Sequence, residues 1–320
     1  MKEDEIAALD GDWAEFTPAE RAAFAFCRKL TLEPHRLADD DIDQLRKHYK
    51  DLQILEMILS MAGNNSINRW KEGAGIPQSP TGGGLGGRTE TPAGKHTYLT
   101  PTSDPFKNKI TQVAPLLLDD KTGQPTRRCV FRGPPLGSRE EVERALAACR
   151  RRAPSLPLVE EARAREVLPE DWPHGPLPQW VRLLANFPGG AKGRIAGIRS
   201  AEEKGDLSPL LKAQVSWIVA RQDRAWYAVG LAQQRLTELG CSDDQIDKLD
   251  GDWKDFSASE RALFTVARQL TASPIVHTDG EVAEAVRLVG PRDVVQLINY
   301  SAGRASFDRM TEAAGLQLEK

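Results

Sequence analysis

The sequence contains 320 residues, of which 40% are hydrophobic and 28% charged, with a formal net charge of -3 and a pI near 6.0. This length suffices for about two globular domains, and the charge balance gives no reason to expect a nucleic-acid partner. The sequence has no run of about 18 apolar residues, and its first residues lack the apolar stretch of a secretory signal. We therefore expect a globular cytoplasmic protein with neither a nucleic-acid nor a membrane partner.

Four cysteines are spread along the chain, with no Cys-x-x-Cys pair and no Cys/His spacing typical of a metal site: Cys27, Cys129, Cys149 and Cys241. This distribution argues against a disulfide scaffold and against a zinc site. We expect isolated thiols, no metal and no cofactor.

An internal repeat relates the two ends of the chain. The stretch "LDGDWAEFTPAERAAFAFCRKLT" from Leu9 matches "LDGDWKDFSASERALFTVARQLT" from Leu249 at an offset of 240 residues, without a gap. The same offset pairs Arg69 with Arg309. Residues 1–76 are therefore predicted to repeat residues 241–316.

Each copy of the repeat predicts three helices. Thr17-Pro-Ala-Glu20 and Ser257-Ala-Ser-Glu260 are capping boxes, in which hydroxyl and glutamate satisfy free N–H groups at a helix start. A short helix with an acidic start follows, and then a longer one that ends near a glycine. Apolar residues recur at spacings of three and four throughout, so the predicted fold class is all-α.

The region between the copies divides into two parts. Residues 77–137 are rich in Gly and Pro and predict an extended connector, because "GGGLGG" lacks the Lys-Ser ending of a phosphate-binding loop. Residues 138–320 predict a complete helical module, in which residues 176–240 form two shorter helices and one of near 30 residues. The first copy has no counterpart of these helices, so residues 1–76 are predicted to be a half-module that packs against the complete one.

The stretch from Pro209 to Gly240, with the repeat unit after it, resembles the carboxymuconolactone decarboxylase and alkylhydroperoxidase D-like superfamily, most closely its peroxidase-related branch. The similarity includes Tyr227 within the motif helix and Leu239-Gly240 after it. It covers residues 176–315, with residues 1–75 as a second C-terminal half. The resemblance implies a decarboxylase-like helical bundle that assembles as a homo-oligomer, from dimer to hexamer.

The reactive residues of that superfamily are replaced in this chain. The Cys-x-x-Cys-x-x-x-His signature falls on Ala225, Ala228 and Ala232, and an upstream glutamate falls on Ala213. Peroxide reduction needs a thiolate, a resolving thiol and a proton relay, and decarboxylation needs proton donors, none of which alanine supplies. The expected function is thus that of a non-catalytic or small-anion-binding helical oligomer.

Four residues near the lost motif are candidates for a replacement site: Arg221, Asp223, Arg224 and Tyr227. On a continuous helix both arginines would share the stripe of alanines and could bind a small anion. Alternatively, the alanines admit a close helix, the arginines pair with acids or face water, and Tyr227 makes a structural hydrogen bond. The alternative function is a peroxidase-type oxidoreductase or a lyase that uses these four residues or a distant cysteine.

Overall fold

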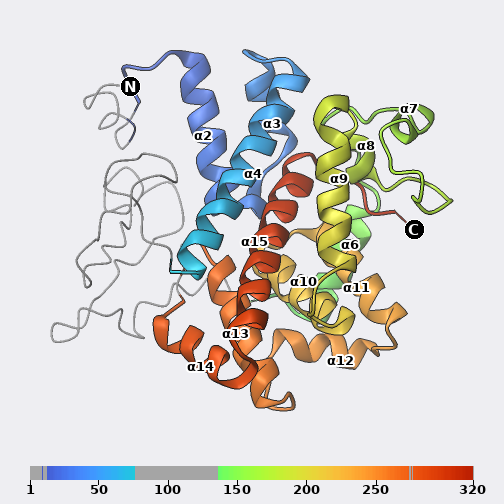
Figure 1. The fold of residues 1–320 in the computed structure, drawn as a ribbon. Coiled ribbons are helices and arrows are strands. Elements are labelled where there is room, and N and C mark those ends of the chain that lie inside the picture. The colour runs from blue at the N-terminus through green and yellow to red at the C-terminus, as the bar shows by residue number, and fades with distance from the viewer. Residues whose placement is uncertain (1–8, 10–12, 76–135, 274, 276, 320) are drawn as a thin grey trace, which may run out of the picture.

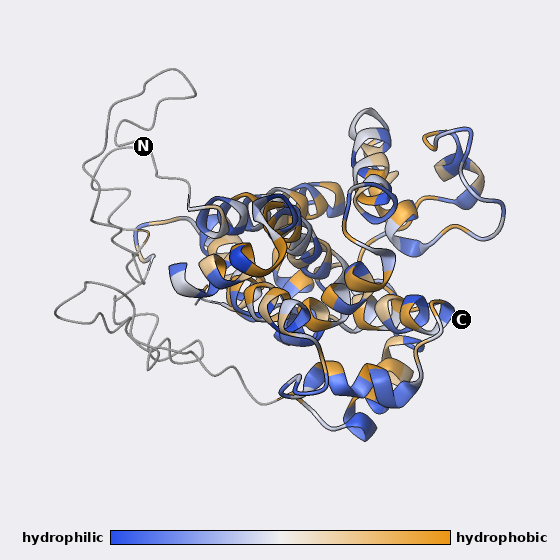
Figure 2. Ribbon diagram, turned by 60° about the horizontal axis from the view of Figure 1, so that its bottom comes forward, coloured by the Kyte–Doolittle hydropathy of each residue, from blue (hydrophilic) through white to orange (hydrophobic). Residues whose placement is uncertain are grey.

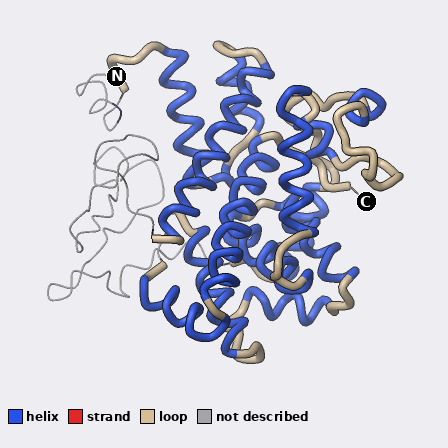
Figure 3. Tube along the Cα trace, viewed as in Figure 1, coloured by secondary structure: helices blue, strands red, loops and turns tan. Residues whose placement is uncertain are grey.

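The structure is a computed structural model that describes residues 9, 13–75, 136–273, 275 and 277–319. Every regular element in these ranges is a helix (Figure 3), which confirms the all-α prediction. Of the predicted connector, only residues 136 and 137 lie within the described ranges. No helix in these ranges is long and apolar enough to cross a membrane.

From residue 13 onward, the described part of the N-terminal unit contains three α-helices and one short 3-10 helix: α2 (Pro18–Leu32), η1 (Pro34–Arg36), α3 (Asp39–Arg46) and α4 (Asp51–Gly73). The C-terminal counterparts of the α-helices are α13 (Ala258–Thr271), α14 (Asp279–Val289) and α15 (Pro291–Ala313). Each of these begins 240 residues after its counterpart. Both predicted capping boxes are present at the starts of α2 and α13.

A corner with the same geometry precedes α2 and α13. Trp13 and Trp253 both have positive φ angles, 62° and 59°. The Arg28 guanidinium lies 3.9 Å from the Trp13 ring centroid, and the Arg268 guanidinium lies 3.8 Å from that of Trp253. Because the corner recurs in two different surroundings, its conformation follows from the local sequence.

The long helices α4 and α15 lie side by side at the centre of the molecule (Figure 1). Arg69 on α4 donates to the Thr271 carbonyl at the end of α13 (3.3 Å), and Arg309 on α15 donates to the Thr31 carbonyl on α2 (3.0 Å). Equivalent residues thus exchange equivalent contacts, as they do across a two-fold interface. The two units therefore pair like the halves of a pseudo-symmetric dimer.

The remaining helices are α6 (Arg139–Cys149), α7 (Glu161–Arg165), α8 (Gln179–Leu184), α9 (Pro188–Glu203), α10 (Pro209–Asp223), α11 (Trp226–Glu238), α12 (Asp243–Asp247) and the 3-10 helix η3 (Lys248–Asp250). Helices α8 to α11 lie on the side of α15 away from α4 (Figure 1). Apolar residues concentrate between the packed helices (Figure 2), and a single buried cluster runs through both units.

The prediction of one helix near 30 residues before the second copy is wrong. Helix α10 ends at Asp223, and α11 begins at Trp226. Between them Arg224 adopts a left-handed conformation (φ 51°, ψ 38°), and the Ala225 N–H donates to the Ala220 carbonyl (2.9 Å). This is the Schellman ending of a helix, which usually places glycine at the left-handed position. Because arginine stands there instead, the sequence gives no signal of the break.

Candidate functional site

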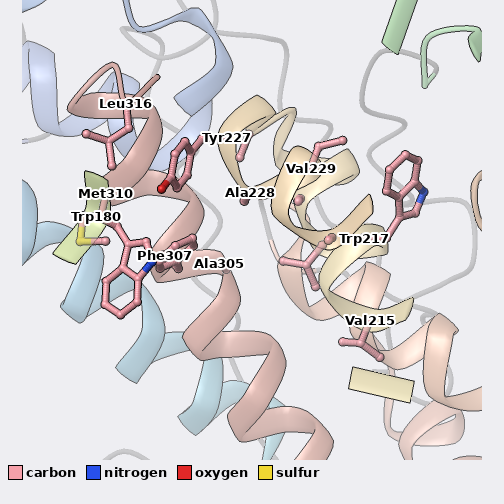
Figure 4. Close-up of a cluster of buried hydrophobic side chains, with 14 of the residues drawn as sticks. Trp180, Val215, Trp217, Tyr227, Ala228, Val229, Ala305, Phe307, Met310 and Leu316 are labelled. Atoms are coloured by element: carbon pink, nitrogen blue, oxygen red, sulfur yellow. The ribbon is translucent and has the colours of Figure 1, made fainter. Parts of the chain in front are cut away.

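Three of the positions that the resemblance aligns with the superfamily signature lie where α11 begins. Ala225 is the N-cap of α11, Ala228 is the third residue of the helix, and Ala232 lies one turn farther; all three are buried. A helix N-terminus stabilises a thiolate, so cysteines here would have lowered pKa values. Ala213 is also buried, within α10. The local geometry suits thiol chemistry, but all four positions carry alanines that belong to the buried apolar cluster, of which Figure 4 shows Ala228.

Arg221 is fully buried and directed toward η3. Its Nε donates to Asp250 Oδ2 (2.8 Å), and its Nη2 donates to the Gly137 carbonyl (2.9 Å). The guanidinium also lies 5.9 and 5.7 Å from the ring centroids of Trp217 and Trp226. Asp250 and these neighbours neutralise and enclose the Arg221 charge, so it is not presented to a ligand.

Asp223 lies on a different side of α10, because residues two apart on a helix do not face each other. It forms a buried ion pair with Arg309 on α15 (2.8 Å). Arg224 lies at the helix break in a left-handed conformation, so α10 and α11 do not form the continuous stripe that one long helix would create. Its charge acts on η1, where burial first and the Arg224 charge second lower the pKa of His35.

Tyr227 makes structural hydrogen bonds. Its hydroxyl donates to Glu319 Oε1 (3.0 Å), and its backbone N–H donates to Glu312 Oε1 (3.2 Å). Burial, reinforced by the charge of Glu319, raises the pKa of the Tyr227 hydroxyl. The ring lies against Phe307 (centroid distance 6.4 Å) in the cluster of Figure 4. The four candidate residues therefore do not converge on a common site.

Asp308 on α15 is a buried acid that sequence reasoning missed. Its side chain is fully buried, and neither carboxyl oxygen has a hydrogen-bond partner in the described part of the chain. Burial first and the Asp223 charge second raise its pKa, while Arg304 and Arg309 act in the opposite direction. One signal was available: the repeat aligns Asp308 with Asn68, so the second copy carries an acid where the first carries a neutral amide.

A polar network joins α9, α10 and α15 two turns from Asp308. The Tyr300 hydroxyl donates to Glu202 (2.8 Å) and lies 2.7 Å from Ser216 Oγ. Arg304 Nη1 donates to the same carboxylate (3.1 Å). Burial raises the pKa of Tyr300. This arrangement fastens three helices together and leaves the Tyr300 proton on its oxygen at neutral pH.

The described cysteines are free thiols on separate elements. Burial raises the pKa of the Cys27 thiol to about 11 and also raises that of Cys149. Thiols with raised pKa values are poor nucleophiles near neutral pH. The described residues contain no group of three or more His, Cys, Asp or Glu side chains that could hold a metal ion.

A small surface hollow lies between α6 and α12. Arg139, Trp217 and Asp243 are among its lining residues. Arg139 forms ion pairs with Asp243, Asp244 and Asp247 at 3.0–3.2 Å. Its charge is therefore already balanced by acidic neighbours.

Comparison with known proteins gives no match to a family model, a curated protein or a solved structure.

Proposed function

We propose that this chain is a non-catalytic helical protein on an alkylhydroperoxidase D-like scaffold, in which structural contacts have replaced the reactive groups. The observation that carries the proposal is the start of α11. Buried alanines occupy the N-cap and the third helical position there, where the superfamily signature places its two cysteines.

The neighbouring polar residues support the same conclusion. Arg221, Asp223 and Tyr227 each contact a protein partner across a helix interface, with Asp250, Arg309 and Glu319 respectively. Groups engaged in this way stabilise packing and are not free to bind or protonate a substrate. The small-anion form of the hypothesis has less support, because Arg221 already pairs with a carboxylate.

A second candidate, lyase-type proton transfer, rests on Asp308. Burial and the Asp223 charge raise its pKa, and this shift favours the protonated carboxyl that a general acid needs. Its oxygens have no partner among the described residues, so a substrate atom could accept that proton. Loss of an observed turnover in Asp308→Asn, with folding retained, would favour this candidate.

Hydroperoxide turnover with a dithiol reductant tests the first proposal. We compare the natural protein with Ala225→Cys/Ala228→Cys, with and without Ala232→His. The control Ser257→Cys/Glu260→Cys places the same pair at the N-cap and third position of α13. We expect background turnover from the natural protein, and turnover from the restored pair at least about tenfold above the control pair, because removing one catalytic group commonly costs 10²-fold or more.

Two results would contradict the proposal. Turnover by the natural protein well above background would show that another group is reactive. A restored pair that folds, by circular dichroism, but does not exceed the control would show that the start of α11 is not a peroxidase scaffold. The variant without Ala232→His is included because a histidine at that buried position overpacks the core and could prevent folding.

A further inference from the structure

The face of α4 that points away from α15 is exposed along its length. We call this surface the open face and define it by six exposed residues: Glu56, Ser60, Asn64, Ile67, Asn68 and Lys71. Ile67 is 51% exposed, which is high for an isoleucine within a long helix. The described part of the chain places no element over this face.

The same face is covered in the other copy of the repeat. Five of the six equivalent positions on α15 are buried: Tyr300, Arg304, Phe307, Asp308 and Thr311. Helices α9, α10 and α11 cover them, and the N-terminal unit has no counterpart of these helices among the described residues. The fold therefore buries this face on α15, whereas the described residues leave the equivalent face of α4 exposed.

We propose that the open face of α4 binds the open face of a second copy of this chain, with the two helices antiparallel. Such a contact is isologous, so each residue on one chain meets its complement on the other. The inference does not depend on the proposed function, because it concerns α4 and not the start of α11.

The sequence of α4 is complementary to itself in this orientation. Glu56 and Lys71 are the only charged residues of the open face, and they lie at equal distances on either side of the point between Gly63 and Asn64. With a rise of 1.5 Å per residue, each lies about 11 Å from that point. In an antiparallel pair centred there, each Glu56 is opposite the Lys71 of the other chain, at both ends of the contact.

The apolar residue is matched in the same register. Ile67 lies as far from the centre on one side as Ser60 does on the other. Each Ile67 would therefore enter a hollow between the small residues Ser60 and Gly63 of the other helix. The space outside the Gly63 Cα is open, since a Cβ there would meet no atom within 4 Å. Both the charges and the side-chain sizes thus fit the same two-fold axis.

One helix pair buries less area than the roughly 1,200 Å² at the low end of stable interfaces, so we expect a weak, concentration-dependent dimer. Sedimentation velocity of the full chain, of 35.3 kDa, measures the association directly. A series from about 5 to about 500 µM spans the range typical of weak interfaces. We expect the weight-average mass to rise toward that of two chains.

Four variants test the register. Ile67→Glu should abolish association, and Lys71→Glu should weaken it about three- to tenfold, because two attractive exposed pairs become repulsive. The double variant Glu56→Lys/Lys71→Glu should restore it, since the charges are exchanged but remain complementary. The control Val295→Glu places the same charge at a 50% exposed apolar position on α15 and should leave association unchanged.

Three results would overturn the proposal. The first is a monomer at every concentration. The second is a dimer that persists in Ile67→Glu, which would place the interface elsewhere. The third is a dimer weakened by Lys71→Glu but not restored by the double variant, which would contradict the antiparallel register.

Discussion

Helices α4 and α15 have the same length and equivalent positions in the repeat, yet their surroundings differ. On α15, α9 to α11 cover the face opposite α4, and the residues from Phe307 to Ala313 are buried without interruption. On α4, only the side toward α15, α2 and α3 is buried. The difference shows that the repeat unit specifies helices, whereas the elements added around one copy specify which side chains become core.

The residue types follow this difference. At equivalent positions Ile67 is exposed and Phe307 is buried, and Asn68 is exposed where Asp308 is buried without a hydrogen-bond partner in the described residues. Covering the helix thus increased apolar burial but also enclosed an acid. Three pairs of substitutions and one single substitution test this difference between the two helices.

The largest effect is expected for truncation of the apolar pair. Phe307→Ala should lower the free energy of unfolding by about 3–5 kcal/mol, because it leaves a cavity beside Trp180 and Tyr227. Ile67→Ala should change it by less than about 0.5 kcal/mol, since an exposed side chain loses little packing. Urea unfolding at a protein concentration low enough to avoid association measures both. Similar costs for the two would show that the open face is covered.

The second-largest difference in the free energy of unfolding is expected between substitutions of Arg309 and Arg69. Arg309→Met should cost about 3–5 kcal/mol, because it leaves the buried Asp223 carboxylate without its ion-pair partner. Arg69 has no carboxylate partner in the described residues, and burial together with the Arg309 charge lowers its pKa to about 9. Arg69→Met should therefore cost only about 1–2 kcal/mol, from lost hydrogen bonds.

A double variant checks this assignment. Arg309→Met/Asp223→Asn should recover part of the loss of Arg309→Met, as measured by urea unfolding. A double variant less stable than Arg309→Met alone would contradict the ion-pair explanation.

Substitutions at the equivalent positions 308 and 68 should differ in their effect on the pH dependence of stability. The folded-state pKa of Asp308 is raised above its unfolded value of about 3.9, so its contribution to stability is full below about pH 4 and is lost as the pH rises through the folded-state pKa. Asp308→Asn should remove this loss and make the protein more stable than wild type at neutral pH. Thermal unfolding from acid to neutral pH provides the measurement. The exposed change Asn68→Asp is the control and should leave the pH profile unchanged.

The smallest change in stability is expected at the break between α10 and α11, two helices that have no equivalent in the described part of the N-terminal unit. Arg224→Gly should raise the melting temperature slightly, since glycine adopts the left-handed conformation without the penalty of about 1 kcal/mol that other residues incur. Differential scanning calorimetry can measure this small change in melting temperature. A clear destabilisation would show that the Arg224 side-chain contacts outweigh the backbone strain.

The predictions that rest on local signals are confirmed. The capping boxes at Thr17 and Ser257 begin α2 and α13, and the apolar spacing predicts each helix of the repeat. Prediction failed at Arg224, where a residue other than glycine adopts a left-handed conformation that local propensity disfavours. The break also means that Arg221 and the alanines of α11 do not form the predicted stripe, because residues on either side of it do not follow one helical period.

The sequence alone determined the all-α class, the positions of the repeat helices and the absence of a Cys-x-x-Cys pair. These features depend on residues within a few positions of one another, or on residue identity itself. The tertiary structure alone decided that Arg221 pairs with Asp250, that Asp223 pairs with Arg309, and that Asp308 is enclosed while Asn68 is not. Burial and ion pairing join residues from distant segments, and they depend on which helices cover a face, which the repeat pattern does not encode.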